Sequence, residues 1–108
     1  MFARILEFEI KVEKKEEFVH LFKTEVLPIL RKAPGFVEFL PFFPESANDK
    51  KIYTISFWDK KWNAEKYEKE WYPKIYNLLK PFITTPVEVK FYNLETTLCE
   101  HFVEAFAA

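Results

Sequence analysis

The stretch Ile52–Ile83 constrains the fold most, because an alternating segment runs directly into a long helical pattern. Over Ile52–Trp58 the side chains alternate with period two, which predicts a strand with two unlike faces. These faces carry Tyr53, Ile55 and Phe57 on one side, and Thr54, Ser56 and Trp58 on the other. One face is therefore apolar, and the other is mixed and ends in a tryptophan.

The helix after this strand is predicted from large side chains that recur every three or four residues. They are Trp62, Tyr67, Trp71, Ile75, Leu78, Leu79 and Phe82. Asp59 is the expected N-cap, because its carboxylate can accept hydrogen bonds from the free amides of the first turn. Pro73 lacks an amide hydrogen and its ring crowds the preceding turn, so we expect two helical pieces, about Lys60–Trp71 and Pro73–Lys80.

The same alternation predicts a first strand over Phe2–Val12. Its apolar face carries Phe2, Leu6, Phe8, Ile10 and Val12, and its mixed face carries Ala3, Ile5, Glu7, Glu9 and Lys11. A helix follows over residues 13–33, where Pro28 is expected to bend the last turns. Pro34 ends this helix, and Gly35, the sole glycine of the sequence, is expected to need a positive φ.

Two further strands complete the pattern. Phe36–Phe43 is predicted as a strand in which Pro41 is tolerated at a sheet edge or a bulge, and Val87–Tyr92 is predicted as the last strand. In the tail, residues 93–108, we expect an extension of that strand and then a short helix near Glu100–Phe106. The order strand, helix, strand, strand, helix, strand is that of an α+β ferredoxin-like βαββαβ sandwich with an antiparallel sheet. Two helices cover one face of such a sheet, so the other face needs a partner.

Length and composition describe an ordinary small globular protein. The chain has 108 residues, 49% of them hydrophobic and 31% charged, which predicts one domain over residues 1–108 with its core in about residues 2–92. Its net charge of −1 gives no electrostatic reason to bind nucleic acid or an acidic membrane. The lone Cys99 cannot form an intrachain disulfide, and charges come too early for a signal peptide or a membrane span. We expect a cytoplasmic protein.

The aromatic content is less ordinary. Thirteen Phe, five Tyr and three Trp are more rings than one small core usually holds. Some of them are expected to line a second buried surface, either a subunit interface or a ligand cavity. Oligomerisation is the simpler explanation of the two.

Several segments carry a resemblance to a known family: Pro34-Gly35-Phe36 before the second strand, Trp58 at the end of the third, and the segments Tyr72–Ile75 and Leu79–Phe82. With these segments, over about residues 2–92, the sequence resembles the antibiotic biosynthesis monooxygenase family of the dimeric α/β-barrel superfamily. The resemblance implies a homodimer in which the open faces of two sheets form a barrel. It also implies a cavity in each subunit between the sheet and the helices.

The activity that the resemblance implies is oxygen insertion into an electron-rich phenol or quinol without metal or flavin. The ionised substrate would give an electron to O₂, while the protein positions it, favours its anion and excludes water. Trp58 matches the tryptophan that borders the family's cavity. Haem-degrading members carry a helix histidine and a first-strand asparagine, whereas this sequence has Tyr67, Glu68 and Tyr72 in the helix region and no asparagine on the strand. Haem degradation is therefore not expected.

The expected site residues are catalytic Trp58, Tyr72 and Glu7, with Glu9, Thr54, Ser56, Tyr67 and Trp71 as substrate contacts. An aromatic wall can stack on a flat substrate, and a buried carboxylate can act as a general base towards a phenol. Thr54 and Ser56 are expected to supply hydrogen bonds on the same face as the two glutamates. Each residue also has a structural alternative: the aromatic rings can be core, and the glutamates can pair with Arg4, Lys90 or the other subunit.

Other functions stay open beside the monooxygenase. One is a non-catalytic dimer that binds a small hydrophobic ligand, and another is a structural dimer without a ligand. Cys99, His101 and Glu104 are metal-ligating types, but one such cluster in a tail does not make a metal site, and we expect neither a metal nor a cofactor. The charges of the helix over Asp59–Lys80 indicate a solvated helix face.

Overall fold

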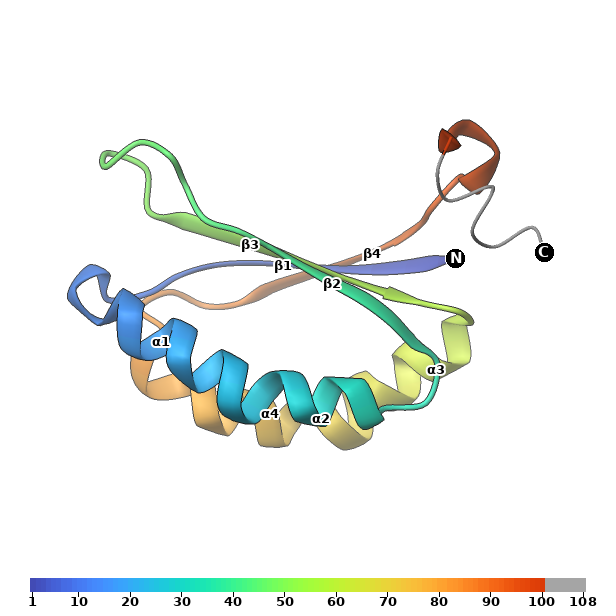
Figure 1. Cartoon of the computed structure of the whole chain (residues 1–108), viewed down its shortest axis with the longest axis horizontal. Coiled ribbons are helices and arrows are strands. Elements are labelled where there is room, and N and C mark those ends of the chain that lie inside the picture. Colours follow the sequence, from blue (N-terminus) through green and yellow to red (C-terminus); the bar gives the residue numbers. More distant parts are fainter. Residues whose placement is uncertain (101–108) are drawn as a thin grey trace.

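The computed structural model describes residues 1–100 of the chain (Figure 1). Within them the strands are β1 (Phe2–Glu9), β2 (Phe36–Phe42), β3 (Lys51–Trp58) and β4 (Glu88–Asn93). The first long helical segment consists of η1 (Val12–Lys14), α1 (Lys15–Leu21), η2 (Phe22–Val26) and α2 (Leu27–Lys32). The second consists of α3 (Lys61–Lys66), η3 (Tyr67–Trp71), α4 (Tyr72–Leu79) and η4 (Lys80–Phe82), and a short turn, η5 (Thr96–Leu98), follows β4.

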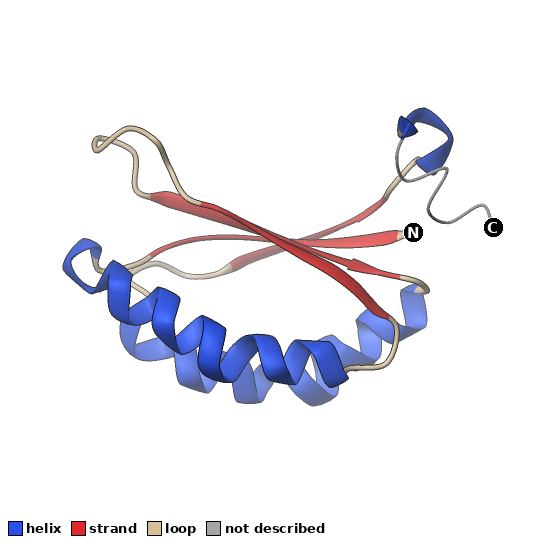
Figure 2. Cartoon of the chain, viewed as in Figure 1, coloured by secondary structure: helices blue, strands red, loops and turns tan. Residues whose placement is uncertain are grey.

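The strands form one antiparallel sheet in the order β2-β3-β1-β4. Both long helical segments lie on the same face of this sheet (Figures 1 and 2). The predicted ferredoxin-like α+β sandwich is therefore confirmed. The opposite face of the sheet, called the open face below, is not covered by a helix within residues 1–100.

The register of β1 and β3 decides which side chains meet the helices. Arg4 lies opposite Ser56 and Leu6 opposite Thr54, so all four point to the helix face. The core on this face includes Phe2, Phe8, Ile52 and Trp58 from the strands and Val26, Leu30, Ile75 and Leu79 from the helices. The core thus carries a polar strip, made by Arg4, Thr54 and Ser56, between its apolar side chains.

The open face carries several large apolar side chains that no helix covers within residues 1–100. Leu40, Phe42, Tyr53 and Tyr92 are 36%, 50%, 40% and 53% exposed, respectively. Ile55 lies at the centre of this face, opposite Ile5 on one side and Leu40 on the other. Large apolar side chains that gather on one face in this way are typical of a protein interface.

Each long helical segment contains a π turn directly before a proline. In each, the residue before the proline donates its amide to the carbonyl five residues back: Leu27 to Phe22, and Tyr72 to Tyr67. Pro28 and Pro73 then fall in the first turn of α2 and α4, the part of a helix where proline is best tolerated. The predicted break into separate pieces at Pro73 is therefore wrong, because the extra residue of the π turn accommodates the ring and the helix continues.

Gly35 makes the turn between α2 and β2 with a φ of 80°, which confirms the predicted positive φ. The amide of Asp59 donates to the carbonyl of Gly35 at 2.9 Å and ties this turn to the start of α3. The sequence predicted Asp59 as the N-cap of this helix, and this prediction is wrong. That position is Lys60, without a side-chain cap, because Oδ1 of Asp59 instead accepts from Nδ2 of Asn63 at 2.8 Å.

The structure confirms one prediction about the strands and corrects another. β2 is an edge strand, which agrees with the position expected for Pro41. The first strand ends at Glu9, not at Val12. Ile10 makes an isolated bridge with Ile83, and Val12 begins the η1 turn with 64% of its surface exposed, so Val12 is not on the apolar face.

The last strand, β4, extends only slightly past its predicted end at Tyr92. It ends at Asn93, the amide of Leu94 donates to the carbonyl of Met1 at 2.9 Å, and the chain enters η5. The helix expected near Glu100–Phe106 lies, beyond its first residue, outside the described residues.

Gly35→Ala tests the turn before β2. An alanine Cβ would lie 2.3 Å from Oδ1 of Asp59 and 2.6 Å from Cβ of Asn63, in addition to the strain of a positive φ. We expect the free energy of unfolding to fall by about 1–3 kcal/mol, measured by urea denaturation. Pro34→Ala, at the neighbouring exposed position, is the control. Equal urea midpoints for Gly35→Ala and the wild type would show that this turn is not strained by a side chain.

Candidate functional site

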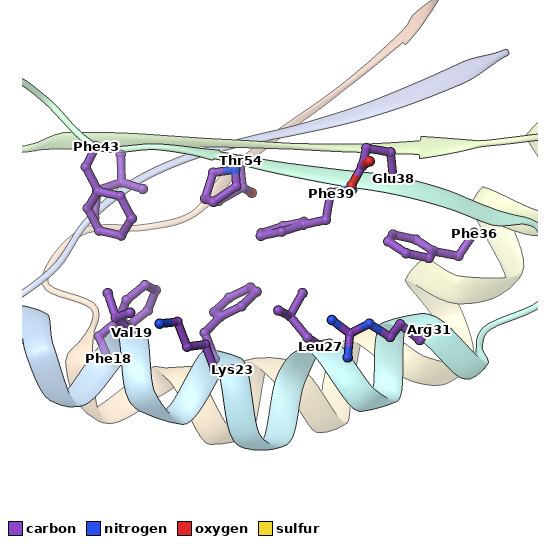
Figure 3. Close-up of a pocket in the computed structure, with 13 residues that line it drawn as sticks. Phe18, Val19, Lys23, Leu27, Arg31, Phe36, Glu38, Phe39, Phe43 and Thr54 are labelled. Carbon is purple, nitrogen blue, oxygen red and sulfur yellow. The ribbon is translucent and has the colours of Figure 1, made fainter. Parts of the chain in front are cut away.

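A cavity of about 270 Å³ lies between α1, η2 and α2 on one side and the edge strand β2 on the other. We call it the outer cavity. Its walls are largely aromatic and aliphatic, and they include Phe18, Phe22 and Leu27 from the helices, Phe36 and Phe39 from the strand, and Phe43 just after it. Figure 3 shows labelled side chains of the two layers pointing toward one another across this space. Exposed Lys23, Arg31 and Glu38 also line it, so the apolar cavity has a charged rim.

A second, much smaller hollow of about 20 Å³ lies deeper between sheet and helices. We call it the inner chamber. It shares Phe22, Phe39 and Thr54 with the outer cavity, so these three residues stand between the two spaces. The rings of Phe22 and Phe39 are stacked, with centroids 4.8 Å apart. The inner chamber is also lined by polar side chains, namely Arg4, Ser56, Tyr67 and Tyr72.

Arg4 is the charged residue of this chamber. It points inward from β1, and its side chain is 3% exposed. Its Nε donates to Oε2 of Glu68, which is one-third exposed. The guanidinium carbon lies 4.2 Å from the ring centre of Tyr72 and 5.2 Å from that of Tyr67. An ion pair and two ring faces therefore fix the position of this cation.

Burial sets the protonation of the two tyrosines. It raises the pKa of Tyr67 and of Tyr72 above the ordinary value for a phenol, and the nearby charge of Arg4 partly opposes this shift in both. Both side chains are therefore neutral near pH 7. At that pH a neutral tyrosine can donate a hydrogen bond but does not act as a ready base.

Trp58 is completely buried, with 0% of its surface exposed. Its Nε1 donates to Oγ of Ser56 at 2.9 Å, and that hydroxyl is 3.5 Å from the carbonyl of Arg4. Its ring lies 4.7 Å from Tyr67 and 5.6 Å from Phe36, measured between centroids. The structure thus places Trp58 behind the inner chamber, where its N–H is already bonded to the protein.

Glu7 and Glu9 are on the other face of the sheet. In the register Glu7 lies opposite Tyr53, whereas Thr54 and Ser56 face the helices, so the prediction that these hydroxyls share a face with the two glutamates is wrong. The Tyr53 hydroxyl donates to Oε1 of Glu7 at 2.6 Å, and this hydrogen bond is the main cause that lowers the Glu7 pKa. A general base towards a phenol needs the opposite shift. The sequence reasoning put the mixed faces of the two strands on the same side of the sheet, but the register pairs Ser56 with Arg4 and Thr54 with Leu6.

Of the remaining predicted contacts, Thr54, Ser56, Tyr67 and Tyr72 line the inner chamber together. Trp71 is half-buried and packs against the core. Cys99 is half-buried, and the nearby residues His101 and Glu104 lie outside the described residues. Within residues 1–100, no group of three or more histidine, cysteine, aspartate or glutamate side chains could hold a metal ion.

The sequence reasoning missed Arg4, Phe22 and Phe39 as site residues. Arg4 carried a usable signal, because a charged residue at position 4 interrupts the inward series of the first strand, between Phe2 and Leu6. Phe22 and Phe39 carried none that separates them from other core aromatic residues. Their role as the boundary between two hollows depends on the packing of the first helical segment against β2.

These features define a class of protein: a ferredoxin-like α+β subunit with an aromatic cavity between its sheet and its helices. The family model described as antibiotic biosynthesis monooxygenase matches residues 1–70. The match covers more than half of the chain, and the chain belongs to this family. A search of curated proteins finds no match. Among the described residues, no helix is long and apolar enough to cross a membrane.

Solved structures agree with this fold. A putative antibiotic biosynthesis monooxygenase from Nitrosomonas europaea is 18% identical, with a TM-score of 0.68 over 88% of this chain and 99% of that chain. A variant of SnoaB, a cofactor-independent oxygenase from Streptomyces nogalater, is 17% identical, with a TM-score of 0.70 over 91% and 96%. A monooxygenase from the gene ActVA-Orf6 of Streptomyces coelicolor, in complex with nanaomycin D, is 15% identical, with a TM-score of 0.69 over 87% of each chain.

Tyr67→Phe tests the protonation of the chamber. Because the Tyr67 pKa is raised on folding, the folded state keeps a proton that the unfolded state loses above about pH 10, so the free energy of unfolding falls as the pH rises through this range. We expect Tyr67→Phe to make that fall shallower, measured by urea unfolding between about pH 8 and 11. Ile75→Val, which weakens the same core without removing an ionisable group, should keep the wild-type slope. Identical slopes for Tyr67→Phe and the wild type would contradict the prediction.

Proposed function

We propose that the protein is a cofactor-independent monooxygenase that oxidises a small aromatic substrate of the phenol or quinol class. The observation that supports this most is the outer cavity, which is aromatic, lies between the sheet and the helices, and adjoins a polar chamber. An engineered cavity of about 150 Å³ in another protein holds a benzene ring, so a volume of about 270 Å³ suits one ring or two fused rings.

The reaction needs no added reductant. For a phenol with a free para position, the ionised substrate gives an electron to O₂, and oxygen then bonds to the para carbon. The para C–H bond and the O–O bond break, one oxygen atom becomes the quinone carbonyl, and the other leaves as water with the para and hydroxyl hydrogens. The phenol loses four electrons and O₂ gains four. The protein's part is to position the ring, favour its anion and exclude water.

The proposed site takes its residues from the helix face of the sheet. Thr54, Ser56 and Tyr72 would contact the substrate oxygen at the inner chamber, with Tyr67 beside them. Trp58 would hold Ser56 in place, and Trp71 would support the helix behind them. The proposed site leaves out Glu7 and Glu9, because their side chains point to the open face.

The working unit in this proposal is a homodimer joined through the open face. Family members are typically dimeric, and this face presents Leu40, Phe42, Tyr53 and Tyr92 as large exposed side chains around Ile55. Pairing two such faces would bury them and would close the barrel that the family resemblance implies. A cytoplasmic location, expected from the composition, stays a prediction.

A second candidate is a non-catalytic dimer that binds a small hydrophobic ligand. It is favoured by the lack of an evident proton acceptor: among the described residues that line the inner chamber there is no carboxylate and no histidine. A substrate would then have to enter already ionised, or lose its proton to water. Ligand binding without any oxygen uptake would support this candidate against the monooxygenase.

Oxygen uptake with α-naphthol tests the enzyme. We expect the wild type to consume one O₂ for each para-naphthoquinone formed, followed with an oxygen electrode and the quinone absorbance. Leu27→Trp places a large ring in the outer cavity and should reduce the rate about tenfold or more, since a filled cavity admits no substrate. Leu98→Trp, at an exposed position elsewhere, should keep the wild-type rate. Equal rates with Leu27→Trp and the wild type would place the reaction outside this cavity.

Sedimentation equilibrium of Ile55→Asp tests the dimer. A carboxylate at the centre of the open face would have to be buried without a partner, so we expect a monomer at micromolar concentration where the wild type is a dimer. Trp62→Asp, at a side chain 66% exposed on α3, is the control and should stay dimeric. A wild-type protein that is already monomeric under these conditions would rule out the proposed interface.

A further inference from the structure

Arg4 has one donor group that the protein does not use. Its Nε is bonded to Glu68, but within residues 1–100 its buried Nη2 has no hydrogen-bond partner. A buried donor of a charged group lowers the stability of the folded protein when it has no hydrogen bond, so a partner from outside the protein is expected for this atom. The position is also held firmly, because the guanidinium lies against the rings of Tyr72 and Tyr67.

The space beside Arg4 limits what that partner is. The inner chamber, at about 20 Å³, has room for a water molecule or a single oxygen atom, and a phosphate or a carboxylate group is too large for it. Arg4 is the one cationic side chain among the described residues that line the chamber, and Glu68 already offsets part of its charge, so the chamber suits one oxygen with at most a single negative charge.

The rest of the ligand would lie in the outer cavity. Phe22, Phe39 and Thr54 line both hollows, so a group that passes them reaches from one space into the other. The stacked faces of Phe22 and Phe39 offer a flat ring an aromatic contact at this boundary. An aromatic ring in the outer cavity with one oxygen substituent therefore matches the two hollows together.

We propose that Arg4 binds the phenolate oxygen of the aromatic ligand, with Nη2 as the donor and the ring in the outer cavity. The identity of the ligand as a phenol rests on the proposed function, but the binding step requires no oxidation. A cation beside the oxygen favours its ionised form, and Arg4 thereby supplies the anion that the proposed oxidation starts from. A water molecule on Nη2 in the free protein would be displaced by the ligand.

The probe for this proposal is para-nitrophenol, whose phenolate has its own visible absorption band. We expect the wild type to bind the phenolate about tenfold more tightly than the neutral phenol, seen as a fall of about one unit in the pKa of the bound probe. Arg4→Met should lose this preference. Para-nitroanisole, which has a similar shape and no ionisable oxygen, should bind both proteins equally.

The controls separate charge, shape and folding. Lys32→Met removes an exposed basic side chain of α2 that lines neither hollow, and it should keep the preference. If Arg4→Met does not fold, Arg4→Lys is the second variant: its one ammonium can keep Glu68 but lacks the forked donors of arginine, so the preference should still be lost. A preference that survives in Arg4→Met or Arg4→Lys would overturn the proposal.

Two further results would also overturn it. One is a wild type that binds para-nitroanisole but shows no phenolate preference, which would mean that Nη2 holds water only. The other is a wild type that binds neither probe. The monooxygenase proposal fails separately: a clear, Arg4-dependent phenolate preference without oxygen uptake from α-naphthol would support Arg4 as the anion-binding group of a ligand-binding protein.

Discussion

The packing of both long helical segments on one face of the sheet is the constraint from which the other features follow. The side chains that β1 and β3 turn toward the helices are mostly apolar, and they form a core with Val26, Leu30, Ile75 and Leu79. Because the strand period is two, the same packing also brings Arg4, Thr54 and Ser56 inside. The apolar core and the polar chamber are thus made by the same alternation of the same strands.

A series of hydrogen bonds connects the residues of this polar strip from Trp58 to Glu68. The indole N–H of Trp58 donates to Ser56, whose hydroxyl lies near the carbonyl of Arg4, and the guanidinium of Arg4 reaches Glu68 on η3. Buried polar groups are stable when each finds a partner, and this series leaves the Nη2 of Arg4 as the buried side-chain atom without one within residues 1–100. Arg4 lines the chamber where a ligand oxygen is proposed to bind.

The prolines contribute to the same site through the helix geometry. A π turn precedes Pro28 in the first helical segment and Pro73 in the second. The first π turn begins at Phe22, which lies between the two hollows, and the second begins at Tyr67, which lines the inner chamber. An inserted residue in a helix changes the direction in which neighbouring side chains point, and such turns occur often at functional sites. Here both of them lie over the chamber.

The sequence by itself determined the order of the elements, the positive φ of Gly35 and the edge position of β2, because each of these depends on local periodicity or on the backbone limits of glycine and proline. It also identified Thr54, Ser56, Tyr67 and Tyr72, which line the inner chamber. The tertiary structure alone decided which strand face the helices cover, and this separated Glu7 and Glu9 from those residues. It also decided that Arg4 meets Glu68, since these residues are 64 positions apart and come together only when η3 packs on β1.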